Sequence, residues 1–320
     1  MLSRLAGLFL PLLLAACVSD GPAVPGPTRL AMTAQRLPLD PADPGRNTVG
    51  RLSYRGGLVL SAADPRFGGL SGLRWRDGRL HAVSDRGDFI VLEPREDKDR
   101  LVGVAGATLT RLRDTRGQPL AGKADAEALT GDGTGGWLVA FERDHRVWRY
   151  PDPDSPAVPT GIDPAALLGP LAGNQGVEAM AGGAEALLLC AERTATAGQP
   201  NCVLGPGTPK PAAVGIESPR RRAAYVPTDA DRLDQASVIV LLRSYSQWEG
   251  AAAMIAIWRA GEGVTRLAAL EPPLSVDNME GIAVRHEGGR TYIYIVSDDN
   301  FSPLQQTLLM KFRLEPEPKP

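Results

Sequence analysis

Short apolar runs separated by turn residues recur along the chain from about residue 70. Five of them contain mostly apolar residues bounded by Gly, Asp or Arg, and they cover residues 79–84, 136–141, 186–190, 237–242 and 291–296. Runs of this length between turn residues predict β-strands of a buried core. Stretches with helical spacing are scarce, and only residues 163–168 suggest one short helix. The pattern therefore predicts an all-β protein.

Each apolar run follows a four-residue signature, and the signatures form an internal repeat. They read Leu70-Ser-Gly-Leu73, Ala126-Glu-Ala-Leu129, Val177-Glu-Ala-Met180, Thr228-Asp-Ala-Asp231 and Met279-Glu-Gly-Ile282. Their second residues are separated by 56, 51, 51 and 51 positions. A period of about 50 residues with several strands in each repeat indicates a β-propeller.

The repeat also predicts how each blade is built. We expect the signature to form the innermost strand and the apolar run the second strand, with residues 146–150 and 308–312 as third strands. Residues 49–54 and 57–60 precede the first signature. They either complete the last blade, which gives five blades, or belong to a split sixth blade.

Charged residues should gather at one mouth of the propeller channel. Antiparallel pairing places the start of the innermost strand beside the end of the second strand. The signatures contribute Glu127, Glu178, Asp229 and Glu280, which we expect to bind a metal ion. The ends of the second strands contribute the candidate catalytic residues Asp85, Glu142, Glu192, Asp298 and Asp299. They also contribute the candidate phosphate-binding residues Arg86, Arg143, Arg193 and Arg243.

These residue types favour one pairing of ligands. Converging carboxylates repel one another, and oxygen ligands suit a hard cation such as calcium. Guanidinium groups bind phosphate or carboxylate oxygens in a bidentate manner. The mouth is therefore predicted to bind calcium and a small-molecule phosphate ester or another anionic ligand. In the alternative interpretation each acid–arginine pair is structural, because turn acids accept backbone hydrogen bonds and arginine links neighbouring blades.

The first residues resemble a bacterial lipoprotein signal. One charge, Arg4, precedes an apolar run over residues 5–14, which is too short to span a bilayer. Leu14-Ala15-Ala16-Cys17 matches a lipobox, so Cys17 is predicted to be the lipidated first residue of the mature chain. The alternative is an ordinary signal peptide with a chance cysteine. Val18 rather than Asp follows the cysteine, which favours the outer membrane with the protein facing the periplasm.

This prediction gives a domain plan. Residues 1–16 form the signal peptide and residues 17–45, rich in proline, a tether. Residues 46–314 form the propeller, and residues 315–320 a disordered tail. The membrane is contacted only through the anchor.

Two further cysteines are expected to form a disulfide. Cys190 and Cys202 are the only other cysteines, and an oxidising periplasm allows them to pair. The alternative is a pair of buried free thiols. Two cysteines and three scattered histidines give no ligand spacing for zinc.

Composition excludes several classes of protein. The net charge is −2, from 35 basic and 37 acidic side chains, so nothing indicates nucleic-acid binding. An apolar content of 43% excludes global disorder. The sequence lacks a Gly-x-Ser-x-Gly elbow, a P-loop and a dinucleotide-binding fingerprint. The five tryptophans are expected to pack between the sheets, and the oligomeric state is not indicated.

Several of these motifs together resemble the phytase-like family, described as having esterase-like activity of phytase. They are Gly69-Leu-Ser-Gly-Leu73, Ser84-Asp-Arg-Gly87, Glu127-Ala-Leu129, Glu178-Ala-Met180, Met279-Glu-Gly-Ile282, Ser297-Asp-Asp-Asn-Phe301 and Thr307-Leu-Leu309. The resemblance covers residues 68–314 and implies an exported β-propeller with phosphoesterase activity. Lysine is sparse in this chain, so arginine would have to bind the phosphate.

We therefore expect a lipid-anchored, calcium-dependent phosphoric-ester hydrolase. Two alternatives stay open: a non-catalytic envelope propeller that binds a ligand or protein, and a metal-dependent lactonase-like esterase.

Overall fold

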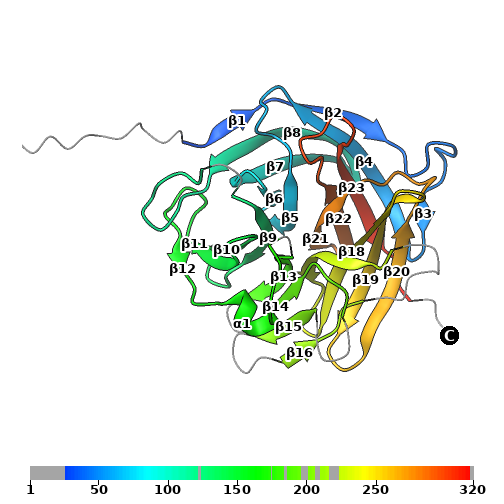
Figure 1. Ribbon diagram of the computed structural model, residues 1–320. Coiled ribbons are helices and arrows are strands. Elements are labelled where there is room, and N and C mark those ends of the chain that lie inside the picture. The colour runs from blue at the N-terminus through cyan, green and yellow to red at the C-terminus, as the bar shows by residue number, and fades with distance from the viewer. Residues whose placement is uncertain are drawn as a thin grey trace, which may run out of the picture.

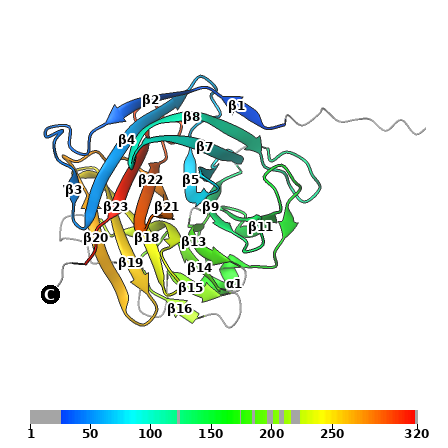
Figure 2. The ribbon, with the colours of Figure 1, turned by 180° about the vertical axis from the view of Figure 1, so that it is seen from behind.

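Five antiparallel sheets surround a central axis in the computed structural model (Figures 1 and 2). The structure describes residues 26–121, 124–173, 175–183, 186–195, 201–205, 210–215 and 223–317. The predicted all-β propeller is confirmed, and the number of blades is five. None of the helices in these ranges is long and apolar enough to cross a membrane.

The first three blades follow one another along the chain. Blade 1 contains β5 (Leu70–Arg76), β6 (Arg79–Ser84), β7 (Asp88–Asp97) and β8 (Arg100–Arg111), with β1 (Thr28–Leu30) on its outer edge. Blade 2 contains β9 (Ala126–Gly131), β10 (Trp137–Phe141), β11 (Arg146–Tyr150) and β12 (Val158–Pro159). Helix α1 (Pro164–Leu168) precedes blade 3, which contains β13 (Val177–Gly183), β14 (Ala186–Ala191), β15 (Cys202–Gly205) and β16 (Lys210–Ala212).

The last two blades include the strand that closes the ring. Blade 4 contains β17 (Val226–Arg232), β18 (Ser237–Ser246), β19 (Gly250–Arg259) and β20 (Gly263–Leu270). Blade 5 contains β21 (Met279–Glu287), β22 (Arg290–Ser297) and β23 (Thr307–Leu314), followed by β4 (Leu52–Ala62) and β2 (Met32–Leu37). The short β3 (Thr48–Val49) pairs with β4. Figure 1 shows the blue β4 beside the red β23, so the N-terminal segment completes the last blade.

The predicted tether over residues 17–45 is too long. Residues 28–37 form β1 and β2, which add to blades 1 and 5. They escaped the pattern analysis because both are outer strands, and β2 is nowhere fully buried. An outer strand needs few apolar residues. At the other end, the backbone N–H of Glu315 donates to the carbonyl of Arg51, so the first residue of the predicted tail is held.

The core lies between neighbouring sheets. On β14, Leu187 and Leu189 pack with side chains of blade 2, whereas Leu188 and Cys190 pack with side chains of blade 4. Successive side chains of a strand point to opposite faces, and here both faces are covered. This explains why the second strands have continuous apolar sequences rather than alternating ones.

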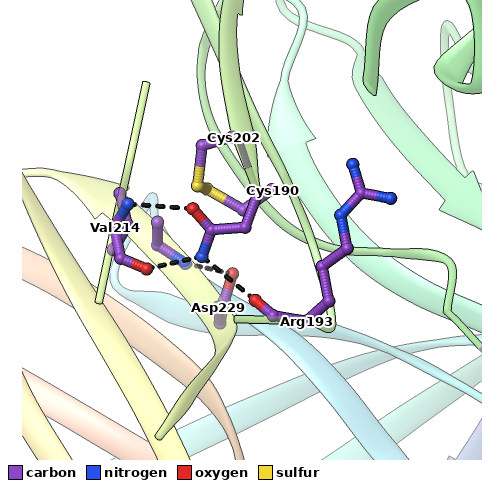
Figure 3. The surroundings of a disulfide bond; sticks show 7 residues. Cys190, Arg193, Cys202, Val214 and Asp229 are labelled. Atoms are coloured by element: carbon purple, nitrogen blue, oxygen red, sulfur yellow. Dashed lines mark hydrogen bonds between the residues drawn. A yellow bond between two sulfur atoms is a disulfide. The ribbon is translucent and has the colours of Figure 1, made fainter. Parts of the chain in front are cut away.

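The predicted disulfide is confirmed. Cys190 and Cys202 lie directly opposite each other on β14 and β15, with a Cα–Cα distance of 4.0 Å. Figure 3 shows Val214 beside the bond. The backbone N–H of Val214 donates to the side chain of Asn201, the residue before Cys202, and the backbone carbonyl of Val214 accepts from the same side chain.

The expectation that all five tryptophans pack between the sheets is wrong for Trp248, because this residue is 95% exposed in the turn between β18 and β19.

Candidate active site at the channel mouth

Every blade has a β-bulge near the start of its innermost strand. The pairing with the second strand skips one residue of the innermost strand: Gly72 in blade 1, and Glu127, Glu178, Thr228 and Glu280 in blades 2 to 5. A bulge redirects the side chains next to it. We call this place the bulge position, with Ser71, which precedes Gly72, as its occupant in blade 1; the occupants are Ser71, Glu127, Glu178, Thr228 and Glu280.

A second recurrent position lies just beyond the second strand. In four blades the backbone N–H of this residue donates to the carbonyl of the residue two before the bulge position, as Glu142 does to Asp125 at 2.8 Å and Asp298 to Asn278 at 2.8 Å. This repeated bond fixes the two positions side by side. We call it the strand-end position; its occupants are Asp85, Glu142, Glu192, Arg243 and Asp298.

Nine of the ten residues at these two positions, all except Thr228, line a cavity of about 250 Å³ at one end of the channel. We call it the acidic mouth. Eight carboxyl groups and two guanidinium groups line it: Asp85, Asp125, Glu127, Glu142, Glu178, Glu192, Glu280 and Asp298, with Arg143 and Arg243. Three predicted metal ligands (Glu127, Glu178, Glu280) and four predicted catalytic residues (Asp85, Glu142, Glu192, Asp298) therefore meet. Asp229, Asp299, Arg86 and Arg193 are not part of the lining.

Asp229 is not a residue of the acidic mouth, because blade 4 is shifted by one position relative to the other blades. Thr228 occupies its bulge position and donates from Oγ1 to the carbonyl of Met279 at 3.0 Å. Asp229 is fully buried beside Arg74, with guanidinium–carboxylate distances of 2.9 and 3.0 Å. It also accepts backbone N–H bonds from Leu73 (2.9 Å) and Ile282 (2.8 Å).

Arg74 closes the channel below the acidic mouth. Its guanidinium donates to backbone carbonyls on four innermost strands, those of Leu73, Met180, Ala230 and Ile282. Arg74 also lines a separate cavity of about 400 Å³ that lies toward the other ends of these strands. Burial raises the pKa of Asp229 to about 6, and the opposing charge of Arg74 keeps the carboxylate ionised at neutral pH. The acidic mouth is therefore a blind cavity with a neutral ion pair beneath it.

The four predicted arginines do not form one phosphate site. Arg243 occupies the strand-end position of blade 4, where other blades have an acid, and pairs with Glu192 and with Glu280 at 2.8 Å. Burial lowers the pKa of Arg243, but these two carboxylates outweigh it and the net pKa is raised. Arg143 pairs with Asp125 at 3.1 Å while its side chain stays 58% exposed.

The other two arginines lie one residue beyond the strand-end position and bind elsewhere. Arg86 donates to the carbonyl of Pro65 at 2.7 Å and its guanidinium lies 3.4 Å from the ring centre of Phe301. Arg193 donates to the carbonyls of Leu168 and of Pro170, the latter at 3.0 Å. In these two pairs only the acid, Asp85 or Glu192, reaches the cavity, whereas Glu142 and Arg143 both line it.

Asp299 has a structural environment as well. Its carboxylate accepts from the backbone N–H groups of Gly69 (2.9 Å) and Phe301 (3.0 Å) and from the hydroxyl of Thr307 (3.0 Å). These bonds hold the turn after β22 against the start of blade 1. We therefore assign Asp299 to the turn and not to the cavity.

Two carboxyl groups of the acidic mouth, those of Glu280 and Asp298, have pKa values near neutral pH. Burial raises the pKa of Glu280 to about 8 against the effect of Arg243, and burial with the nearby Asp85 raises that of Asp298 to about 7. Burial and neighbouring carboxylates hold the pKa values of Glu127 and Glu178 well above their ordinary range. At pH 7 the cavity thus contains both proton donors and proton acceptors.

Sequence reasoning missed four polar residues of the cavity: Ser71, Asp125, Asn278 and Asn300. Ser71 donates from Oγ to Glu127 at 3.2 Å. Asp125 and Asn278 each lie two residues before a bulge-position glutamate. This shared offset is the sequence signal that marks both residues.

The cavity offers oxygen ligands but no finished metal site. Within the ranges that the structure describes, no three His, Cys, Asp or Glu side chains are arranged so that they could hold a metal ion. The donors themselves fit a hard cation, since they are carboxylate, amide and hydroxyl oxygens. Binding would require the carboxylates to move closer together.

Fold and site together define a five-bladed β-propeller with a carboxylate-lined channel mouth. The sequence model of the phytase-like family, described as "Esterase-like activity of phytase", matches residues 65–301. This is about three quarters of the chain, so the protein belongs to the phytase-like family. No curated protein matches the chain in sequence.

One solved structure agrees on the fold. The catalytic domain of the GH62 α-L-arabinofuranosidase of Coprinopsis cinerea is similar with a TM-score of 0.50 and 12% identity, covering 84% of this chain and 99% of that one. At this identity the likeness shows the fold alone. The major allergen Mala s 1 of Malassezia sympodialis also matches, with a TM-score of 0.38 and 12% identity, covering 91% and 96%.

Proposed function

We propose that the protein is a calcium-dependent phosphoric-ester hydrolase that acts at the acidic mouth. The observation that carries this proposal is that eight carboxyl groups and two guanidinium groups of the described residues gather around one cavity of about 250 Å³. The description of the family, an esterase-like activity, supports hydrolysis of an ester.

The residues that would hold the cation are those at the bulge position, Glu127, Glu178 and Glu280. They come from three different blades and lie in one cavity. Their raised pKa values mean that a cation would displace protons, which links its affinity to pH. Calcium accepts six to eight oxygen ligands in flexible geometry, so a set of several carboxylates without an octahedral arrangement suits it better than it suits magnesium.

When bound, such a cation polarises a phosphoryl oxygen and lowers the pKa of a coordinated water. We assign to Asp298 the role of accepting the proton of the attacking water or returning it to the leaving alcohol, and its pKa of about 7 supports this assignment. Arg243 is already neutralised by Glu192 and Glu280. Arg143 forms an ion pair with Asp125 and has a side chain that is 58% exposed, so it is the guanidinium of the mouth best able to contact a phosphate oxygen.

Titration calorimetry and thermal unfolding with calcium test this proposal. Calcium at 100 times its Kd should stabilise the folded protein by ~2.7 kcal/mol, because it binds only that state. Glu178→Gln should lose most of this stabilisation and most phosphatase activity. The matched control is Glu262→Gln, which removes a carboxylate that is 73% exposed on a surface turn.

Two results would change the conclusion. If calcium at millimolar concentration neither binds nor stabilises, the carboxylates are structural and a non-catalytic binding role replaces the hydrolase. If calcium binds but only carboxylic esters or lactones are cleaved, the lactonase-like alternative is correct. Parallel assays of phosphate esters, carboxylic esters and lactones, each with calcium or a chelator, separate these cases.

We also propose that the protein is anchored to the bacterial outer membrane through Cys17 and faces the periplasm. Cys17 lies outside the described residues, and the lipobox that it ends is the support. Cys17→Ala should abolish membrane fractionation or leave the precursor unprocessed. Normal processing with unchanged fractionation would exclude lipidation.

A further inference from the structure

A larger cavity of about 720 Å³ lies beside the acidic mouth. We call it the side groove. Glu192, Arg243, Asn278 and Asn300 line both cavities, so the two are direct neighbours that share these residues as a wall. A molecule bound at the mouth can therefore extend over this wall into the side groove.

The side groove exists because blade 4 has an unusually long second strand. Strand β18 has ten residues, compared with five in β10 and six in β14, and it pairs with β19 as far as Ser246 and Gly250. The hairpin therefore projects beyond the strand-end position at Arg243. The opposite wall is the turn after β22, which contributes Ser302 and Leu304.

One aromatic side chain of β18, that of Tyr245, lines the side groove. Tyr245 follows Arg243 by two residues, so both side chains lie on the same face of the strand, about 6.6 Å apart along it. Tyr245 is 64% exposed and lines the side groove. Leu304 on the other wall is 92% exposed, and neither side chain contributes to the core.

The charges of the side groove are unsuited to a polyanion. Among the described residues that line it, the only basic one is Arg243, which Glu192 and Glu280 already neutralise. The acidic residues of the described lining are Glu192 and Asp277. A leaving group that carries several phosphates would bring its negative charge against these two carboxylates.

We infer that the side groove binds the alcohol part of the ester, and that this alcohol is uncharged and carries a ring or another flat apolar face. The inference rests on the proposed function for the reacting end of the substrate. Tyr245 stacks against the ring, while Asn278 and Ser302 provide hydrogen bonds at its edge. The preferred substrate is a phosphomonoester of such an alcohol rather than a polyphosphorylated polyol such as inositol hexakisphosphate.

Substrate kinetics of the full chain test this inference. Calcium-supported hydrolysis is measured with 1-naphthyl phosphate, glycerol 2-phosphate and inositol hexakisphosphate. We expect the highest kcat/KM for naphthyl phosphate. Tyr245→Ala should raise its KM about tenfold with kcat little changed, and should leave glycerol phosphate unaffected. Trp248→Ala is the control, because this exposed aromatic lies on the same hairpin but does not line the side groove.

A second measurement keeps the test independent of catalysis. Uncharged 1-naphthol reports on the side groove alone, and its binding is followed by saturation-transfer NMR. Binding that is lost in Tyr245→Ala and kept in Trp248→Ala supports the inference even if no phosphate ester is cleaved, in which case only the proposed function fails. Equal naphthol binding by all three proteins overturns the inference. Preference for inositol hexakisphosphate, unchanged in Tyr245→Ala, also overturns it.

Discussion

Glu280 should make the protein less stable as the pH rises through neutrality. Its carboxyl group has a pKa of about 8 in the folded protein and an ordinary value of 4.5 in the unfolded chain. Between these two values the folded protein keeps a proton that the unfolded chain has released. The free energy of unfolding therefore falls as the pH increases, and the penalty is complete only above pH 8.

The size of the effect follows from the same two pKa values. A rise from 4.5 to about 8 corresponds to ~5 kcal/mol at 1.36 kcal/mol for each pH unit. Part of this free energy comes from repulsion between Glu280 and Asp298, since Asp298 ionises more readily when Glu280 is neutral. We therefore expect Glu280→Gln to be about 2–4 kcal/mol more stable than the wild type at pH 9 and equally stable at pH 4.5. Arg243 retains Glu192 as its partner in the variant.

Guanidinium-chloride unfolding at intervals from pH 4.5 to 9, with a chelator present, measures this difference. The chelator is needed because a bound cation would offset the same repulsion. Glu262→Gln, at an exposed turn, should follow the wild-type curve. The reasoning is refuted if wild-type stability does not fall between pH 5 and 8.5, or if Glu280→Gln falls as steeply as the wild type.

Two further predictions concern the buried structure. Asp229→Asn should destabilise the protein by ~3–5 kcal/mol, because it leaves the buried Arg74 without its main counter-charge, whereas the double variant Arg74→Met/Asp229→Leu should lose much less. Equal losses in denaturant unfolding of both would show that packing and not charge dominates. Replacing Cys190 and Cys202 together with Ala should lower stability by ~3 kcal/mol, because the bond closes a loop with a sequence separation of 12. An unchanged Tm for that variant would mean that the strand pairing alone holds the loop.

The repeat made most of the fold predictable from the sequence. Each blade buries its second strand on both faces, so the apolar runs stand out, and the signatures mark where each innermost strand begins. The same repetition located most of the acidic mouth, since Glu127, Glu178 and Glu280 occupy one structural position. The outer strands were not predictable in this way, because β1 and β2 are half-exposed and need no apolar pattern.

The error at Asp229 shows the limit of counting residues. A spacing of 51 aligned Asp229 with Glu178, but the ladder of blade 4 places Thr228 at that position. Strand pairing defines which residue faces the axis, and a shift of one residue reverses the face. The sequence of blade 4 also differs at the strand-end position, where Arg243 replaces the acid of the other blades. This difference indicated that blade 4 departs from the repeat.

The closed fifth blade has a consequence for how the chain reaches its folded state. Leu60 and Thr307 are paired although they lie 247 positions apart in the sequence. During synthesis β2 and β4 are made long before β23. Until β23 is made, the edge of β4 that pairs with it has no partner strand. Open edges pair readily with other chains, so the interval before closure is the period of greatest aggregation risk. A chain truncated before residue 307 would have four complete blades, but its β21–β22 hairpin could not pair with β4. The ring can therefore close only after the eight residues of β23 have been added.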